Sequence, residues 1–279
     1  MIRLFNPGKQ KGLSLIELLV TMIIGLFITV GISSVYVGNK RSSMTTNELS
    51  LLQANGRAVL EQLTQVIQHA GYKATRGSLG QDMFILGAVS NSRCSRGADS
   101  VANTGLFGTT QNDNTTRGDT IGVVYLGDDR LTTDCTGLPI PNDCRLSDAS
   151  DAPPLAASRL YSYFKVDVRA DDMPVLTCAG SLGATEDEIA EGVENLQINY
   201  GEDADGDGIA DRFVNSNDVV NWGSIVSVNV AVLVRSLRPV AVKKSSRSYQ
   251  LLDGVIISTD DKYLRSVFTT TIRLRNATS

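Results

Sequence analysis

Hydrophobic residues are concentrated near the start of the chain, in a run from Leu18 to Val37 that contains no charged residue. A helix of about 20 residues, each rising 1.5 Å, spans the roughly 30 Å hydrocarbon core of a bilayer. A cleaved secretory signal would instead have an apolar region of about 7 to 15 residues followed by small residues. The run therefore predicts a membrane-spanning helix.

A second pattern follows the apolar run, with hydrophobic positions every three or four residues, as in a one-sided helix. The positions are Leu49, Leu52, Val59, Leu60, Leu63, Val66, Ile67 and Ala70. Gly71 is expected to end this helix, and no proline lies between Pro7 and Gly71. One continuous helix of about 58 residues is predicted, with its first half in the membrane and its second half on a globular domain.

Beyond Tyr72 the chain consists of short β-branched runs separated by turn residues. Strands are predicted at Thr120–Leu126, Val193–Tyr200, Ile225–Arg235 and Val267–Arg275. In the third strand, every second residue from Val226 to Val234 is a valine, so these side chains share one face. Because helix and strands each have one apolar face, we expect an α+β fold with an antiparallel sheet packed on the second half of the helix. Residues 76–182 are expected to be loop-rich.

All four cysteines follow the apolar run, and their spacing lacks the paired pattern of a zinc site. They are Cys94, Cys135, Cys144 and Cys178. Two disulfides in an oxidising compartment are predicted, and three connectivities are open. The favoured pairing joins Cys135 to Cys144 and Cys94 to Cys178.

An acidic, glycine-containing loop carries carboxylates at alternate positions, namely Asp203, Asp205, Asp207 and Asp211. With Gly208 at the sixth position and a backbone carbonyl from Ile209, they match the first nine places of a calcium loop. The twelfth place is Val214 where such a loop has a bidentate Glu, so Ca²⁺ is expected to bind more weakly than in a sensor unless Glu202 or Asp218 supplies the missing ligand. The alternative is a solvated turn between two strands.

Enzymatic chemistry has little support in the sequence. His69 is the single histidine, and it lies near the end of the one-sided helix, where a capping or interface role is expected. No catalytic cofactor is expected, because there is no phosphate-binding glycine motif. The net charge of −4 argues against a broad nucleic-acid surface.

The first 16 residues are basic, with Arg3, Lys9 and Lys11 and no acid. Such a charge distribution keeps the N-terminal end of a membrane helix in the cytoplasm. Glu17 then stands at the mouth of that helix, where an ionisable group is costly and calls for a partner.

A glycine at Gly12, an apolar Leu13 and an acid at Glu17 together resemble the class III leader of type IV prepilins and type II secretion pseudopilins. The resemblance implies that a prepilin peptidase cuts between Gly12 and Leu13 and that the new N-terminus of Leu13 is methylated. Glu17 would then face the N-terminal amine of a neighbouring subunit during assembly. Most members of the family have Phe where this chain has Leu13.

The resemblance implies the following organisation of the chain. Residues 1–12 form the leader, 13–38 the transmembrane half of the helix, 39–72 its amphipathic half, and 73–279 a head with the pilin fold. Within the head, residues 76–182 form a variable region and 193–279 a C-terminal sheet with the calcium-type loop. The protein would sit in the bacterial inner membrane by a single pass, with its head in the periplasm, and later at the pilus tip on the cell surface.

Several segments of the head resemble the PilW-type minor pilins of type IV pili. They are Glu191 to Gly201, the acidic loop, Trp222, the end of the third strand and the C-terminal Phe268 to Asn276. The likeness covers the first 70 and the last 90 residues. It implies a structural subunit that joins other minor pilins and the major pilin, primes pilus assembly and presents a large adhesin-type protein at the tip, supporting adhesion and twitching. The alternatives are a J-type minor pseudopilin of type II secretion and a tip-located binding module.

Overall fold

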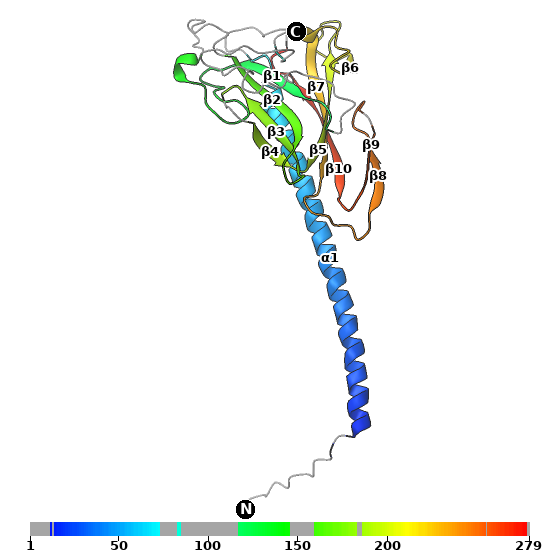
Figure 1. Ribbon diagram of the computed structural model, residues 1–279. Coiled ribbons are helices and arrows are strands. Elements are labelled where there is room, and N and C mark those ends of the chain that lie inside the picture. The colour runs from blue at the N-terminus through cyan, green and yellow to red at the C-terminus, as the bar shows by residue number, and fades with distance from the viewer. Residues whose placement is uncertain are drawn as a thin grey trace, which may run out of the picture. The chain divides into compact units, whose positions relative to one another are not determined.

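A single helix, α1 (Leu15–Ile67), carries the whole N-terminal apolar run in the computed structural model (Figure 1). The structure describes residues 12, 14–72, 83–84, 117–145, 159–182, 186–254 and 256–277. They belong to two compact units, one ending at Asn47 and the other beginning at Glu48. The continuous helix predicted from the sequence is confirmed, with 53 residues.

In the first unit, the side chains of the apolar run are exposed. Among the described residues, α1 is the one helix long and apolar enough to cross a membrane. The serine and threonine hydroxyl groups of its first half donate to backbone carbonyls three or four residues earlier: Thr21 to Leu18, Thr29 to Gly25, Ser33 to Thr29 and Ser34 to Gly31. Because lipid offers no hydrogen-bond partner, this internal pairing suits a helix in hydrocarbon.

In the second unit, α1 buries one stripe of its surface, spaced by three or four residues as the sequence predicts. The stripe consists of Glu48, Leu52, Gly56, Val59, Leu63 and Ile67. Leu49, predicted to belong to it, is 43% exposed. The stripe instead continues with Gly56, which apolar periodicity does not reveal.

At Gly56 the backbone of the helix comes close to the sheet that covers it. A Cβ atom at this position would lie 2.2 Å from the ring of Phe268. The aromatic ring therefore occupies the space that any larger residue would need, and the glycine sets the distance between helix and sheet at this level.

Gly71 ends the helical segment, as predicted. It adopts a φ of +74°, which a residue with a Cβ rarely tolerates, and its N–H donates to the carbonyl of Val124 at 2.8 Å. The chain leaves the helix already hydrogen-bonded to a strand of the head.

The first sheet is an antiparallel meander of four strands in the order β1-β2-β3-β4. Its strands are β1 (Ile121–Leu126), β2 (Arg159–Val168), β3 (Pro174–Gly180) and β4 (Asp187–Glu191). Three of them lie in the region 76–182, so the part of this region that the structure describes contains strands as well as loops.

The second sheet has the order β10-β7-β5-β6, with every neighbouring pair antiparallel. Its strands are β5 (Val193–Glu202), β6 (Arg212–Val214), β7 (Ile225–Arg235) and β10 (Arg265–Arg273). Two further strands, β8 (Ser245–Tyr249) and β9 (Ile257–Asp261), pair with each other. All four strands predicted from the sequence are present, and β7 has the predicted bounds.

The central strand β7 is covered on both faces. Its even-numbered valines from Val228 to Val234 join the main core with the helical stripe. On the opposite face Ala231 and Leu233 are buried against Leu251, in a second, smaller cluster. The sequence predicts one apolar face here; the second arises because the segment between β8 and β9 packs against it.

The two sheets are joined beside β5. Gly118 forms a parallel bridge with Leu196, and the N–H of Asp119 donates to the Leu196 carbonyl at 2.7 Å. The buried carboxylate of Asp119 accepts the N–H of Ile198 at 2.8 Å. These bonds hold the start of β1 against the second sheet.

The contact between Gly56 and Phe268 gives a direct test of the packing. Replacing Gly56 with Leu should lower the free energy of unfolding by about 1–3 kcal/mol, because the side chain has no space. Denaturant unfolding of the purified chain in detergent measures this. Gly38→Leu is the matched control, since a Cβ there meets no atom within 4 Å; an equal loss in both variants would contradict the assigned contact.

Candidate functional site

The segment that carries the prepilin-like residues forms the first turn of α1. The carbonyl of Ser14 accepts the N–H groups of Glu17 at 3.0 Å and of Leu18 at 3.2 Å. Gly12 precedes this turn and is exposed, and Leu13 lies outside the described residues. The glycine is thus outside the helix, and the acid is within its first turn.

Glu17 is exposed, and among the described residues no side chain forms an ion pair with it. Its place at the positive end of the helix dipole stabilises a carboxylate by about 0.3–1 kcal/mol in water. That is small beside the cost of a charge in hydrocarbon. A single copy of the chain therefore supplies only part of the stabilisation that Glu17 needs in a membrane.

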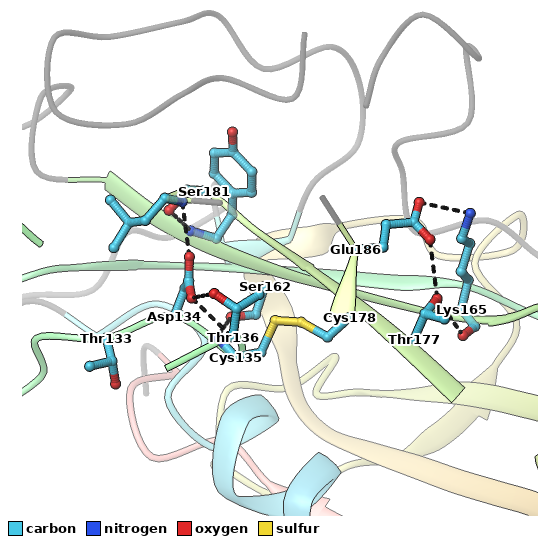
Figure 2. The surroundings of a disulfide bond; sticks show 12 residues. Thr133, Asp134, Cys135, Thr136, Ser162, Lys165, Thr177, Cys178, Ser181 and Glu186 are labelled. Atoms are coloured by element: carbon cyan, nitrogen blue, oxygen red, sulfur yellow. Dashed lines mark hydrogen bonds and ion pairs between the residues drawn. A yellow bond between two sulfur atoms is a disulfide. The ribbon is translucent and has the colours of Figure 1, made fainter. Parts of the chain in front are cut away.

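The head contains a disulfide between Cys135 and Cys178, whose Cα atoms are 6.3 Å apart (Figure 2). Cys178 lies in β3, opposite Phe164 of β2. The N–H of Cys135 donates to the Ser162 hydroxyl, also on β2, at 3.0 Å. The β2–β3 pairing thus brings the loop cysteine beside the strand cysteine.

This bond overturns the predicted connectivity. The pairings Cys135 with Cys144 and Cys94 with Cys178 are wrong, because Cys135 and Cys178 bond to each other. Cys144, in the short helix η4 (Asn142–Cys144), is buried and also disulfide-bonded, and Cys94 lies outside the described residues. The prediction relied on nearness in sequence, whereas strand register decides the pairing.

Asp134, next to the disulfide, is a buried carboxylate that ties the loop to the end of β3 (Figure 2). It accepts the N–H of Thr136 at 2.9 Å and the N–H of Leu182 at 2.9 Å. A Cβ at Gly180 would lie 2.1 Å from its oxygen. The loop is therefore fixed by a covalent bond and by a fully engaged carboxylate.

His69 lines a cavity of about 270 Å³ between helix and loop, together with Tyr125 and Asp134. Burial lowers the pKa of the imidazole, and nearby Arg275 lowers it further. The Tyr125 hydroxyl donates to the Thr133 carbonyl at 3.1 Å, and burial raises its pKa. The acid and the hydroxyl that share the cavity are thus engaged in holding the loop.

In the acidic loop, three of the four predicted carboxylates come together. Oxygen atoms of Asp203, Asp205 and Asp211 lie within 4.8 Å of one another. Asp203 is buried and the other two are exposed. Such a group of oxygens is suited to a hard cation such as Ca²⁺.

The backbone of the loop wraps around Asp203. Its two oxygens accept the N–H groups of Gly206 at 2.7 Å and Gly208 at 2.8 Å. Both glycines have positive φ, +83° and +82°. Burial acts to raise the pKa of Asp203, but the N–H groups of Gly208 and Gly206 lower it below its usual value. The loop is thus organised around an ionised carboxylate.

The remaining predicted ligands are not members of this group of three carboxylates. The carboxylate of Asp207 accepts the N–H of Ile209 at 2.7 Å, and Ile209 is exposed. Glu202, proposed as an additional ligand, forms an ion pair with Arg212 at 2.6 Å. Asp218 accepts the side-chain amide of Asn215 at 2.7 Å. Both additional acids therefore have other partners.

The sequence did not identify the group that closes this loop. Arg212 begins β6 and binds the buried Glu202, which also accepts the N–H of Asn221 at 2.9 Å. The sequence signal for this ion pair was an acid and a base ten residues apart, a spacing that is too common to identify a contact. The ion pair anchors both ends of the acidic loop to β5 and β6.

Comparison with known proteins agrees with these features. A family model described as Type IV Pilus-assembly protein W matches residues 163–276. A second, described as Prokaryotic N-terminal methylation motif, matches residues 7–33. The first match begins before the region that resembled this family by sequence, and it includes most of β2 and all of β3. No curated protein matches the chain.

Among solved structures, a type IV-like pilin from Thermus thermophilus is similar, with 11% sequence identity and a TM-score of 0.38. The match covers 84% of this chain and 98% of that one. The long N-terminal helix, the antiparallel sheets and the methylation motif define a type IV pilin-like protein with an α+β fold. Within this class, residues 163–276 are similar to the PilW-type minor pilins.

The disulfide gives a test by peptide mapping. Proteolysis of the non-reduced chain should release a linked pair of peptides containing Cys135 and Cys178. The double variant Cys135→Ser, Cys178→Ser should lose about 2–4 kcal/mol of unfolding free energy, because the bond closes a loop of 43 residues. A peptide pair joining Cys135 to Cys144 in mass spectrometry would contradict the structure.

Proposed function

We propose that this chain is a structural subunit that helps to prime type IV pilus assembly and takes its place at the pilus tip. The observation that carries the proposal is the acid at Glu17 in the first turn of an exposed, membrane-length helix, inside a prepilin methylation motif. The apolar helix and the motif fit membrane anchoring with a periplasmic head. The description of the matched family as a pilus-assembly protein supports a role in a type IV pilus rather than in a type II secretion pseudopilus.

Glu17 supplies the assembly contact in this proposal. Cleavage after Gly12 creates a new amine at Leu13, which carries a positive charge even when methylated. The amine of a neighbouring subunit then pairs with the Glu17 carboxylate, and each group removes the cost of the other in lipid. Assembly is favoured because the described residues of a single chain offer Glu17 no such partner.

The partners in this account are other minor pilins, the major pilin and a large adhesin-type protein at the tip, with the prepilin peptidase acting first. The family is structural, which supports a role without catalysis. The disulfide-fixed loop and the glycine-set helix packing support a rigid head, as a subunit under mechanical load requires.

The first test separates cleavage from assembly. Gly12→Val should block cleavage, Gly12→Ala should reduce it, and each should leave uncut chain in the inner membrane. Glu17→Ala should leave cleavage largely intact and lower the amount of chain in sheared pili by about tenfold or more, because the buried amine loses its counter-charge. Immunoblots of membrane and pilus fractions measure both effects.

Thr21→Val is the matched control in the same helix, since the Thr21 hydroxyl bonds only to the carbonyl of Leu18. It should leave both cleavage and incorporation unchanged. Normal incorporation of the Glu17→Ala variant would refute the assembly contact.

We further propose that the acidic loop binds Ca²⁺ through Asp203, Asp205 and Asp211, with Asp207 and the carbonyl of Ile209 as additional ligands. The convergence of three carboxylates supports this, since they repel one another without a cation. The other acids nearby are engaged elsewhere, so we expect a Kd of about 10⁻⁴–10⁻³ M, as in extracellular modules.

Isothermal titration of the purified chain in detergent tests the calcium site. Ca²⁺ should bind to the natural chain, and Asp203→Ala or Asp211→Ala should abolish the binding, since each removes one of the converging oxygens. Asp218→Ala is the control, because Asp218 bonds to Asn215. Absence of Ca²⁺ binding at millimolar concentration, or unchanged binding in Asp203→Ala, would refute the site.

A further inference from the structure

Strand β10 (Arg265–Arg273) is an edge of the second sheet, with β7 as its one neighbour there. It pairs with β7 over nine residues without a register shift. The edge strand β6 has three residues. The edge strand β4 is irregular in its pairing and rich in acids. Proteins protect sheet edges with short strands, bulges and charges, so β10 is the least protected of these edges.

One hydrogen bond just beyond the end of β10 determines which residues of this strand point their backbone groups toward β7 and which point them away. The N–H of Leu274 donates to the carbonyl of Val226, which continues the β10–β7 register. In an antiparallel pair, alternate residues bond to the partner strand, and the residues between them point their backbone groups away. The N–H and C=O groups of Thr269, Thr271 and Arg273 therefore face away from β7.

These outward groups are open in the part of the chain that the structure describes. Thr269, Thr271 and Arg273 have exposed side chains, and no backbone hydrogen bond to another segment reaches them. Three successive threonines, from Thr269 to Thr271, favour an extended backbone. The edge presents a regular ladder of donors and acceptors at the spacing of an added strand.

A groove with basic side chains adjoins the end of this edge. A cavity of about 630 Å³ is lined by Thr64 of α1, by Gln68 just after this helix and by Thr271 to Arg275. Arg273 and Arg275 are exposed, and among the described residues no acid forms an ion pair with either. Arg273 reaches only the carbonyl of Gly208, at 3.5 Å. Two cations are thus available beside the open backbone.

We propose that the outer edge of β10, from Thr269 to Arg273, accepts an added strand from an extended acidic segment of another protein chain, whose carboxylates pair with Arg273 and Arg275. A second copy of β10 would not provide this charge, because the strand has two arginines and no acid. The inference goes beyond the assembly role, since it names a surface and the chemistry of its partner, and it is tested on the purified chain.

The test measures binding of a labelled synthetic peptide of about eight residues, the length of an ordinary strand, that alternates Glu with Val and Thr. Fluorescence anisotropy with the full chain in detergent micelles should show binding. The same peptide with alternate amide nitrogens methylated should bind about tenfold or more weakly, because it loses its ladder donors. A version with Lys in place of Glu should also bind about tenfold or more weakly.

Variants of the chain locate the site. Thr271→Pro should abolish binding without breaking the pairing with β7, because the N–H of Thr271 points outward. Thr271→Val is the matched control and should bind as the natural chain does. The double variant Arg273→Gln, Arg275→Gln should weaken binding of the Glu peptide about tenfold and leave the Lys peptide unaffected.

The proposal is overturned if the Glu peptide does not bind at millimolar concentration, if the methylated peptide binds equally well, or if a folded Thr271→Pro chain binds like the natural one. Should circular dichroism show that the proline variant is unfolded, the methylated peptide on the natural chain still decides. None of these measurements depends on pilus assembly. A negative result would therefore refute the strand-addition proposal without affecting the proposed assembly role, which has its own test.

Discussion

The free-energy cost of one carboxylate in a membrane-length helix is the constraint on which the rest of the molecule depends. Glu17 stands in the first turn of α1, where the described part of a single chain offers it the helix dipole and no cation. The physics of hydrocarbon makes that state costly, and a partner chain with a positive amine removes the cost. In the proposed assembly, the same charge that is unfavourable in the isolated subunit becomes a driving force for association.

The head packs on the second half of this helix. The second half of α1 buries a narrow stripe under two sheets, and Gly56 lets Phe268 lie against the helix backbone. The disulfide between Cys135 and Cys178 then fixes a loop that also packs against the main core. With β7 covered on both faces, the edge at β10 is left as the open margin of the second sheet.

The sequence predicted those parts of the fold that depend on local periodicity. The helix and strand β7 follow from spacings of 3.6 and 2 residues, and Gly71 ends the helix as its position predicts. The disulfide pairing could not be predicted, because it depends on the register of β2 against β3, which places Cys178 beside a loop 43 residues away in sequence.

In the acidic loop, periodicity predicted that the carboxylates would converge, and three of them do. The pattern could not show that Glu202 is engaged by Arg212, since that ion pair depends on the hairpin of β5 and β6. The second apolar face of β7 was missed for a similar reason, because the segment that covers it comes from elsewhere in the chain.

The central claim is that Glu17 contacts the N-terminal amine of another subunit. Treatment of isolated pili with dicyclohexylcarbodiimide, which enters membranes and apolar interiors, tests this contact by joining a carboxylate to an adjacent amine. The account predicts a cross-linked peptide in mass spectrometry with an amide bond between Glu17 and the N-terminal residue of another subunit. Recovery of Glu17 only in unlinked peptides, while other carboxylates in the same pili are cross-linked, would contradict it.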